Sequence, residues 1–122
     1  MDIEKFREHC LSYPQATEDF PFDDTVLVFR IKKHIFACIS LDNPELAVIK
    51  CDPGYAIELR DHYLAIEPAF HWNKKYWNQI WFNRDVDDEM LYRLVKHSFS
   101  EVVKKLPKKE QTDDLKLNCQ QD

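Results

Sequence analysis

The chain contains a single glycine, Gly54, among its 122 residues. Glycine is the residue that tight phosphate-binding loops need, because it adopts positive φ angles freely and lets the backbone approach a ligand closely. Neither the G-x-x-x-x-G-K-[ST] motif nor the G-x-G-x-x-G motif can be formed with one glycine. The sequence therefore excludes glycine-loop nucleotide binding, and it excludes collagen-like and glycine-rich linker architectures as well.

The length and composition are those of one globular domain. Apolar residues make up 44% of the chain and charged residues 32%, which is ordinary for a soluble protein. No apolar run approaches the roughly 20 residues that span a bilayer, and the charged N-terminus has no secretory signal pattern. We therefore expect a cytoplasmic protein with no membrane partner. The sequence leaves the oligomeric state open, and we favour a monomer.

The four cysteines, at positions 10, 38, 51 and 119, form no C-x-x-C pair and have no histidine at zinc spacing. We interpret them as reduced thiols and predict neither a metal site nor a cofactor. The sequence has no G-x-S-x-G or H-E-x-x-H motif, so no catalytic residues are predicted.

Residue periodicity predicts three helices and five strands. Each helix follows an aspartate that can act as its N-cap: Asp2, Asp52 and Asp87. The helices are expected over residues 2–11, 54–61 and 87–106, and the strands over residues 25–31, 34–41, 46–51, 63–67 and 78–82. Residues 16–24 are interpreted as an acidic, aromatic connector.

This element order, α-βββ-α-ββ-α, predicts an α+β fold. We expect an antiparallel sheet of about five strands with helices packed mainly on one face. Residues 1–109 are predicted to form a single domain. Residues 110–122, after the stop signal of Pro107, are polar and are expected to form a frayed C-terminal tail.

Charge is distributed unevenly along this acidic chain, whose formal net charge is −5. Residues 70–109 carry 9 basic and 5 acidic side chains, a net charge of +4. A local basic region can attract phosphates even when the whole protein is acidic. Residues 70–109 are therefore the candidate binding region.

The sharpest cluster in this region comprises His71, Trp72, Asn73, Lys74 and Lys75. Lysines supply point charges to phosphates, an asparagine can bond a backbone or a base edge, and a tryptophan can stack on a base. The structural alternative is a loop in which the histidine and asparagine bond the backbone while the aromatic rings seal the core.

Two further candidates, Lys104 and Lys105, lie near the end of the last predicted helix. They could extend a phosphate-contacting surface. The alternative is that they only solvate the helix and favour its negative C-terminal end. The two interpretations differ in whether these lysines share a face with Lys74 and Lys75.

Residues 68–78 read PAFHWNKKYWN, and the last helix is followed by Leu-Pro-Lys-Lys at 106–109. The sequence resembles the MmcQ/YjbR-like family, which shows a P-x-[YF]-H-x-N-K-x-[HY]-W-N stretch and then an acidic-capped helix ending in L-P-K-K. The resemblance covers roughly residues 1–109. One departure is the turn at Lys32-Lys33, where the family carries a glycine.

The resemblance implies a CyaY-like (frataxin-like) α+β fold, also described as a double wing, and a DNA-binding role without established catalytic residues. We therefore expect a non-enzymatic binding module that contacts DNA phosphates through the basic 70–109 region. The alternative is a small-molecule, metal or protein-partner module of frataxin-like fold, working through a pocket or through the acidic first helix.

Overall fold

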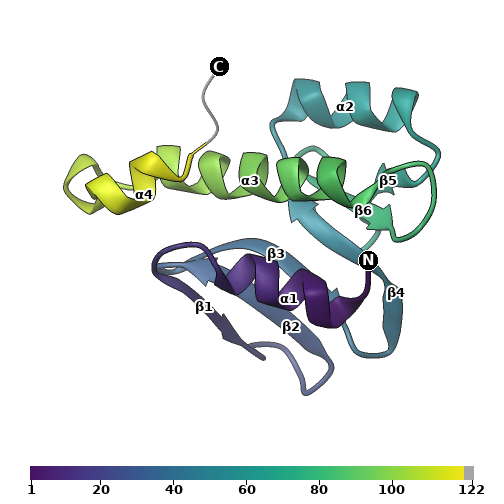
Figure 1. The fold of residues 1–122 in the computed structure, drawn as a ribbon, viewed down its shortest axis with the longest axis horizontal. Coiled ribbons are helices and arrows are strands. Elements are labelled where there is room, and N and C mark those ends of the chain that lie inside the picture. The colour runs from purple at the N-terminus through teal and green to yellow at the C-terminus, as the bar shows by residue number, and fades with distance from the viewer. Residues whose placement is uncertain (120–122) are drawn as a thin grey trace.

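The structure is a computed structural model that describes residues 1–119. The described residues form four α-helices, one short 3₁₀ helix and a single sheet (Figure 1). The helices are α1 (Ile3–Leu11), α2 (Pro53–His62), α3 (Asp88–Lys104), the 3₁₀ helix η1 (Lys108–Glu110) and α4 (Asp113–Leu117).

Six antiparallel strands form the sheet within the described residues, in the order β1-β2-β3-β4-β6-β5. They are β1 (Ala16–Asp19), β2 (Val26–Ile31), β3 (His34–Ser40), β4 (Asn43–Lys50), β5 (Ile66–Pro68) and β6 (Trp77–Trp81). The α+β class, the antiparallel sheet and the order of the predicted elements are confirmed, with one strand more than expected.

The predicted helix starts are confirmed at atomic level. The side chains of Asp2, Asp52 and Asp87 each accept a hydrogen bond from a backbone N–H in the first turn of α1, α2 and α3. These bonds satisfy donors that have no partner inside a helix. Pro53 begins α2, where its missing N–H costs nothing.

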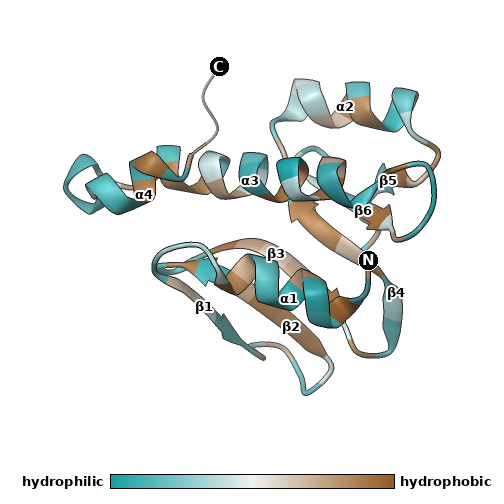
Figure 2. Cartoon of the chain, in the orientation of Figure 1, coloured by the Kyte–Doolittle hydropathy of each residue, from teal (hydrophilic) through white to brown (hydrophobic). Residues whose placement is uncertain are grey.

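The helices cover one face of the sheet. The main core joins residues of α1, α2, α3 and α4 to residues of β2, β3, β4 and β6, including the fully buried Phe6, Phe29, Phe36 and Phe99. Figure 1 shows α1 beside α3 over the sheet, and the rings of His9 and Tyr92 stack between these helices at 4.2 Å. In Figure 2 the central strands are largely hydrophobic, whereas α3 alternates between polar and apolar residues.

On the other face of the sheet, no helix within residues 1–119 contributes to the apolar cluster. Its smaller apolar cluster consists of Val28, Cys38, Leu46, Val48 and Ala69. Strand register places Val28, Cys38, Val48, Gln79 and Glu67 in one row across β2, β3, β4, β6 and β5. This face supplies the floor of the candidate site.

The prediction that residues 16–24 form only a connector is wrong for the first four of them. Ala16–Asp19 form the edge strand β1, paired with β2 so that Thr17 lies opposite Arg30. Arg30 binds the Asp19 carboxylate through its Nε at 2.8 Å. A charged edge strand of this kind lacks the apolar alternation by which strands are recognised, and its charges discourage further pairing.

The segment after Pro107 is more ordered than the predicted frayed tail. Residues 108–110 and 113–117 are helical, and Leu115 is fully buried in the main core. Hydrogen bonds also attach this polar segment, from Gln15 to Thr112 and from Gln111 to the Leu106 carbonyl. The last part of the predicted tail, residues 120–122, lies outside the described residues. Across residues 1–119 no helix combines the length and the apolar character needed to cross a membrane.

Candidate functional site

The candidate site is built on the loop of residues 69–76 between β5 and β6. Its outer side is held by Arg60 of α2. Arg60 donates from Nε to Asn78 Oδ1 at 2.6 Å, and its Nη2 donates to the carbonyl of Lys74. Asn78 is fully buried and also donates to the Ala56 carbonyl at 3.3 Å. A buried amide and a guanidinium therefore determine where the loop lies.

Asn73 has a structural role within this loop. Its side-chain Oδ1 accepts from the N–H of Lys75 at 3.0 Å, and its carbonyl accepts from the N–H of Tyr76 at 3.1 Å. Asparagine commonly makes such turns because its short side chain imitates a backbone carbonyl. The Asn73 side-chain oxygen is therefore occupied by the turn rather than directed at a ligand.

Two aromatic residues of the loop, Phe70 and Trp72, lie on the side of the sheet that no helix covers. Trp72 is half-buried, its ring lying 4.5 Å from that of Trp77 and 6.1 Å from that of Phe22. His71 is exposed beside it. Phe70, which the sequence did not single out, is 61% exposed. Phe70 is thus more open to a stacking partner than Trp72 is.

The structure brings together two of the four predicted lysines. The Nζ atoms of Lys75 and Lys105 lie 5.4 and 5.2 Å from the centroid of the same ring, that of Tyr76. Lys74 instead lies over Phe70, at 5.8 Å. Lys104, the residue immediately before Lys105, forms an ion pair with Glu101 at 3.2 Å.

A third lysine, Lys50 at the end of β4, joins Lys75 and Lys105. Its Nζ lies 6.0 Å from the Trp77 ring centroid. Burial lowers the pKa of Lys50, and repulsion from Lys105 lowers this pKa further, although Glu101 acts against both. We call Lys50, Lys75 and Lys105 the lysine cluster.

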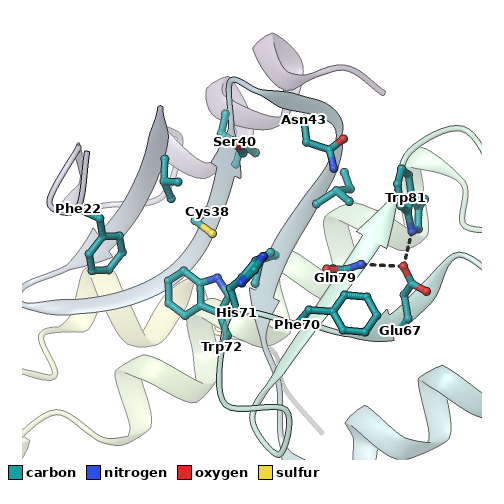
Figure 3. Close-up of a pocket in the computed structure, with 14 residues that line it drawn as sticks. Phe22, Cys38, Ser40, Asn43, Glu67, Phe70, His71, Trp72, Gln79 and Trp81 are labelled. Carbon is teal, nitrogen blue, oxygen red and sulfur yellow. Dashed lines mark hydrogen bonds between the residues drawn. The ribbon is translucent and has the colours of Figure 1, made fainter. Parts of the chain in front are cut away.

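A pocket of about 660 Å³ opens on the helix-free face, next to the loop (Figure 3). Its floor includes Cys38, Leu46 and Val48, and its walls include aromatic side chains. These are Phe22, Phe70, Trp72 and Trp81. Burial raises the pKa of the Cys38 thiol to about 12, so this thiol is protonated near neutral pH and is a poor nucleophile.

Three polar side chains form a hydrogen-bonded group at one end of the pocket. Glu67 Oε1 accepts hydrogen bonds from Gln79 Nε2 at 2.7 Å and from Trp81 Nε1 at 2.6 Å (Figure 3). Strand register explains the first contact, because Glu67 on β5 is directly opposite Gln79 on β6. Among residues 1–119, no cluster of three or more His, Cys, Asp or Glu side chains could hold a metal ion.

Sequence reasoning missed Lys50, Glu67, Phe70, Gln79 and Trp81. Lys50 lies outside the basic segment and reaches it only through the pairing of β4 with β6, in which Lys50 is opposite Trp77. The pocket combines residues of β3 and β4 with residues of the later segment 67–81, which includes β5 and β6. Only the alternation of side chains within a correctly registered sheet could have grouped them.

Comparison with known proteins places these features in a family context. The sequence model of the YjbR family matches residues 11–101. The uncharacterized protein YjbR of Escherichia coli strain K12 is 25% identical over 108 residues, which are 88% of this chain and 92% of that protein. The uncharacterized protein YbdF of Escherichia coli O157:H7 is 29% identical over 103 residues, 84% of each chain.

Two solved structures share the fold. The crystal structure of Deinococcus radiodurans protein DR2400, described as a DUF419 domain, has a TM-score of 0.83 and 32% sequence identity, covering 92% of this chain and 86% of that one. A protein from Pseudomonas syringae has a TM-score of 0.71 and 20% identity, covering 84% of this chain and 99% of that one. The second similarity concerns the fold alone.

Proposed function

The chain belongs to the YjbR family, and we propose that it is a non-enzymatic protein that binds nucleic acid, most directly DNA, through the lysine cluster. The observation that carries this proposal is the convergence of Lys75 and Lys105 on the ring of Tyr76. Two lysines from the loop and from the end of α3 thereby present their charges on one surface.

Electrostatics favours an anion at this surface. Lys50 and Lys105 lie close enough for their repulsion to lower the pKa of Lys50. Within the described residues, none of the three lysines has a salt-bridge partner within 4.0 Å. A bound phosphate would relieve this repulsion, because an opposite charge stabilises the protonated amines.

The neighbouring aromatic side chains favour a nucleic acid over a lone phosphate. Phe70 is largely exposed next to Lys74, whose Nζ lies 5.8 Å from its ring centroid. An exposed ring beside a cation is the arrangement on which unpaired bases stack in proteins that bind single strands. In this proposal Lys75 and Lys105 contact the backbone while Phe70, with His71, meets a base.

Fluorescence anisotropy of labelled single-stranded and duplex DNA across a salt series tests the proposal. We expect micromolar binding. The logarithm of the association constant should fall linearly with the logarithm of the salt concentration. The double variant Lys75→Glu/Lys105→Glu should weaken binding at low salt by about tenfold or more, because it replaces two attractive charges by two repulsive ones.

The matched control is Lys5→Glu/Arg93→Glu. It changes the net charge equally, at exposed positions on α1 and on the first half of α3. If both double variants lost affinity equally, overall charge would explain the effect, and a specific binding surface would be refuted. Absence of binding to either DNA at low salt would refute the proposed function itself.

A further inference from the structure

The pocket on the helix-free face differs from the lysine cluster in its lining, which is mostly apolar and contains a carboxylate where the cluster has ammonium groups. Among the described residues that line it, Glu67 is the only aspartate, glutamate, lysine or arginine. Aromatic rings form much of the wall, and strand residues such as Val48 form an apolar floor. A volume of about 660 Å³ lies within the range of small-molecule sites.

The carboxylate of Glu67 is positioned by neutral donors and not by a cation. Gln79 and Trp81 both donate to Oε1, whereas Oε2 accepts no hydrogen bond from residues 1–119. None of the ion pairs formed by the described residues involves Glu67. The pocket therefore retains a negative charge and an unused acceptor.

Arg84, which contacts the pocket residue Trp81, does not pair with Glu67. The Arg84 guanidinium carbon lies 4.4 Å from the ring centroid of Trp81, so this cation stacks on the indole rather than pairing with Glu67. This contact shows that the Trp81 ring accepts a cation on its face. Aromatic rings and carboxylates both favour positive charge, the first through the ring quadrupole and the second through its full charge.

We infer that this pocket binds a small organic cation with an apolar or aromatic body, whose protonated nitrogen donates to Glu67 while its body packs among Phe70, Trp72 and Trp81. Charge complementarity selects this occupant. An anion would be repelled by the carboxylate, and an uncharged apolar molecule would leave its charge without a cationic partner and its Oε2 without a donor. The inference goes beyond nucleic-acid binding, because the phosphates of a nucleic acid cannot satisfy this site.

A series of indoles that differ in charge tests the inference. Tryptamine is a cation, indole-3-acetate an anion and 3-methylindole neutral, and all three carry the same ring system. Titrations followed by ¹H–¹⁵N correlation spectra would monitor the indole N–H of Trp81 and the side-chain amide of Gln79, the two groups that donate to Glu67. We expect tryptamine to shift both signals and to bind at least about tenfold more tightly than indole-3-acetate.

The variant Glu67→Gln keeps the shape and one acceptor oxygen but removes the charge. We expect it to weaken tryptamine binding about tenfold and to leave 3-methylindole binding unchanged. Glu89→Gln, an exposed substitution on α3, is the matched control and should change neither. If Glu67→Gln is unfolded, its spectrum will show this. The test then rests on the ratio of the affinities of the unmodified protein for tryptamine and for indole-3-acetate.

The inference is overturned if tryptamine leaves the Trp81 and Gln79 signals unchanged, if it binds no better than indole-3-acetate, or if Glu67→Gln binds it normally. Its failure is distinguishable from failure of the proposed function. Lys75→Glu/Lys105→Glu should keep tryptamine binding while losing DNA. Glu67→Gln should keep DNA binding while losing tryptamine.

Discussion

Lys75 and Lys105 lie against the same aromatic ring, that of Tyr76, although one belongs to the loop before β6 and the other follows α3. The ring attracts both ammonium groups and so holds the ends of the two side chains near Tyr76. The register of β4 with β6 brings Lys50 to the same surface, opposite Trp77.

Glu101 is the acidic residue that most directly opposes the lysine cluster. It pairs with Lys104 at 3.2 Å and attracts Lys50, whose pKa it raises. Glu101→Gln should therefore strengthen DNA binding about two- to fivefold at low salt, since it frees one lysine and removes one repulsive charge. Anisotropy titrations would measure the change. The control Glu89→Gln breaks another exposed ion pair, that with Arg93, and should leave DNA binding nearly unchanged. Weaker DNA binding by Glu101→Gln would contradict the assigned surface.

Asn78 should matter more for stability than its size suggests. Its buried side chain accepts from Arg60 and donates to Ala56, so Asn78→Ala leaves both groups without this partner. We expect a loss of about 1–3 kcal/mol in the free energy of unfolding, measured by urea denaturation. Asn73→Ala removes an exposed side chain with one turn bond and should cost less. Equal losses would show that burial is not the cause.

His9 should make the protein less stable in mild acid. Burial lowers the pKa of His9, and a hydrogen bond with the backbone of Tyr92 partly offsets this. A lowered pKa in the folded state means that the unfolded state binds more protons. The stabilising contribution is therefore complete above about pH 6.5, and it is lost as the pH falls from there toward the pKa of the folded state.

The variant His9→Gln, which cannot titrate, should show a shallower dependence of unfolding free energy on pH just below 6.5. Urea denaturation at a series of pH values would measure the slopes. His34→Gln, at an exposed histidine next to the β2–β3 turn, provides the comparison. If only His34→Gln flattened the profile, the role given to His9 would be wrong.

Lys32 occupies a backbone conformation that suits glycine. Its φ angle is 58°, in the left-handed region, where a side chain crowds the following carbonyl. Lys32→Gly should relieve this strain and raise the free energy of unfolding by about 0.5 kcal/mol, after the added freedom of the unfolded chain is subtracted. Lys33→Gly, at the neighbouring turn position without a positive φ, should destabilise instead. Thermal denaturation of both variants would compare them, and destabilisation by Lys32→Gly would contradict the strain.

Local chemistry predicted the features that depend on a few consecutive residues. The N-caps Asp2, Asp52 and Asp87 were predicted correctly because a cap needs only its own side chain and the next turn. The apolar strands were also predicted, within a few residues of their ends. The strand β1 and the burial of Leu115 were missed, because each depends on a partner distant in sequence.

The sequence by itself determined the α+β class, the caps and a basic segment near the C-terminal end. Tertiary structure decided which of those basic residues act together. It joined Lys75 to Lys105, added Lys50 and engaged Lys104 with Glu101. It also created the pocket around Glu67, where side chains of β3 and β4 meet residues of the 67–81 segment and Phe22. Strand register and helix packing decide which of these residues lie close together. Both arise from burying apolar surface across the whole chain, so they cannot be predicted from a short stretch of sequence.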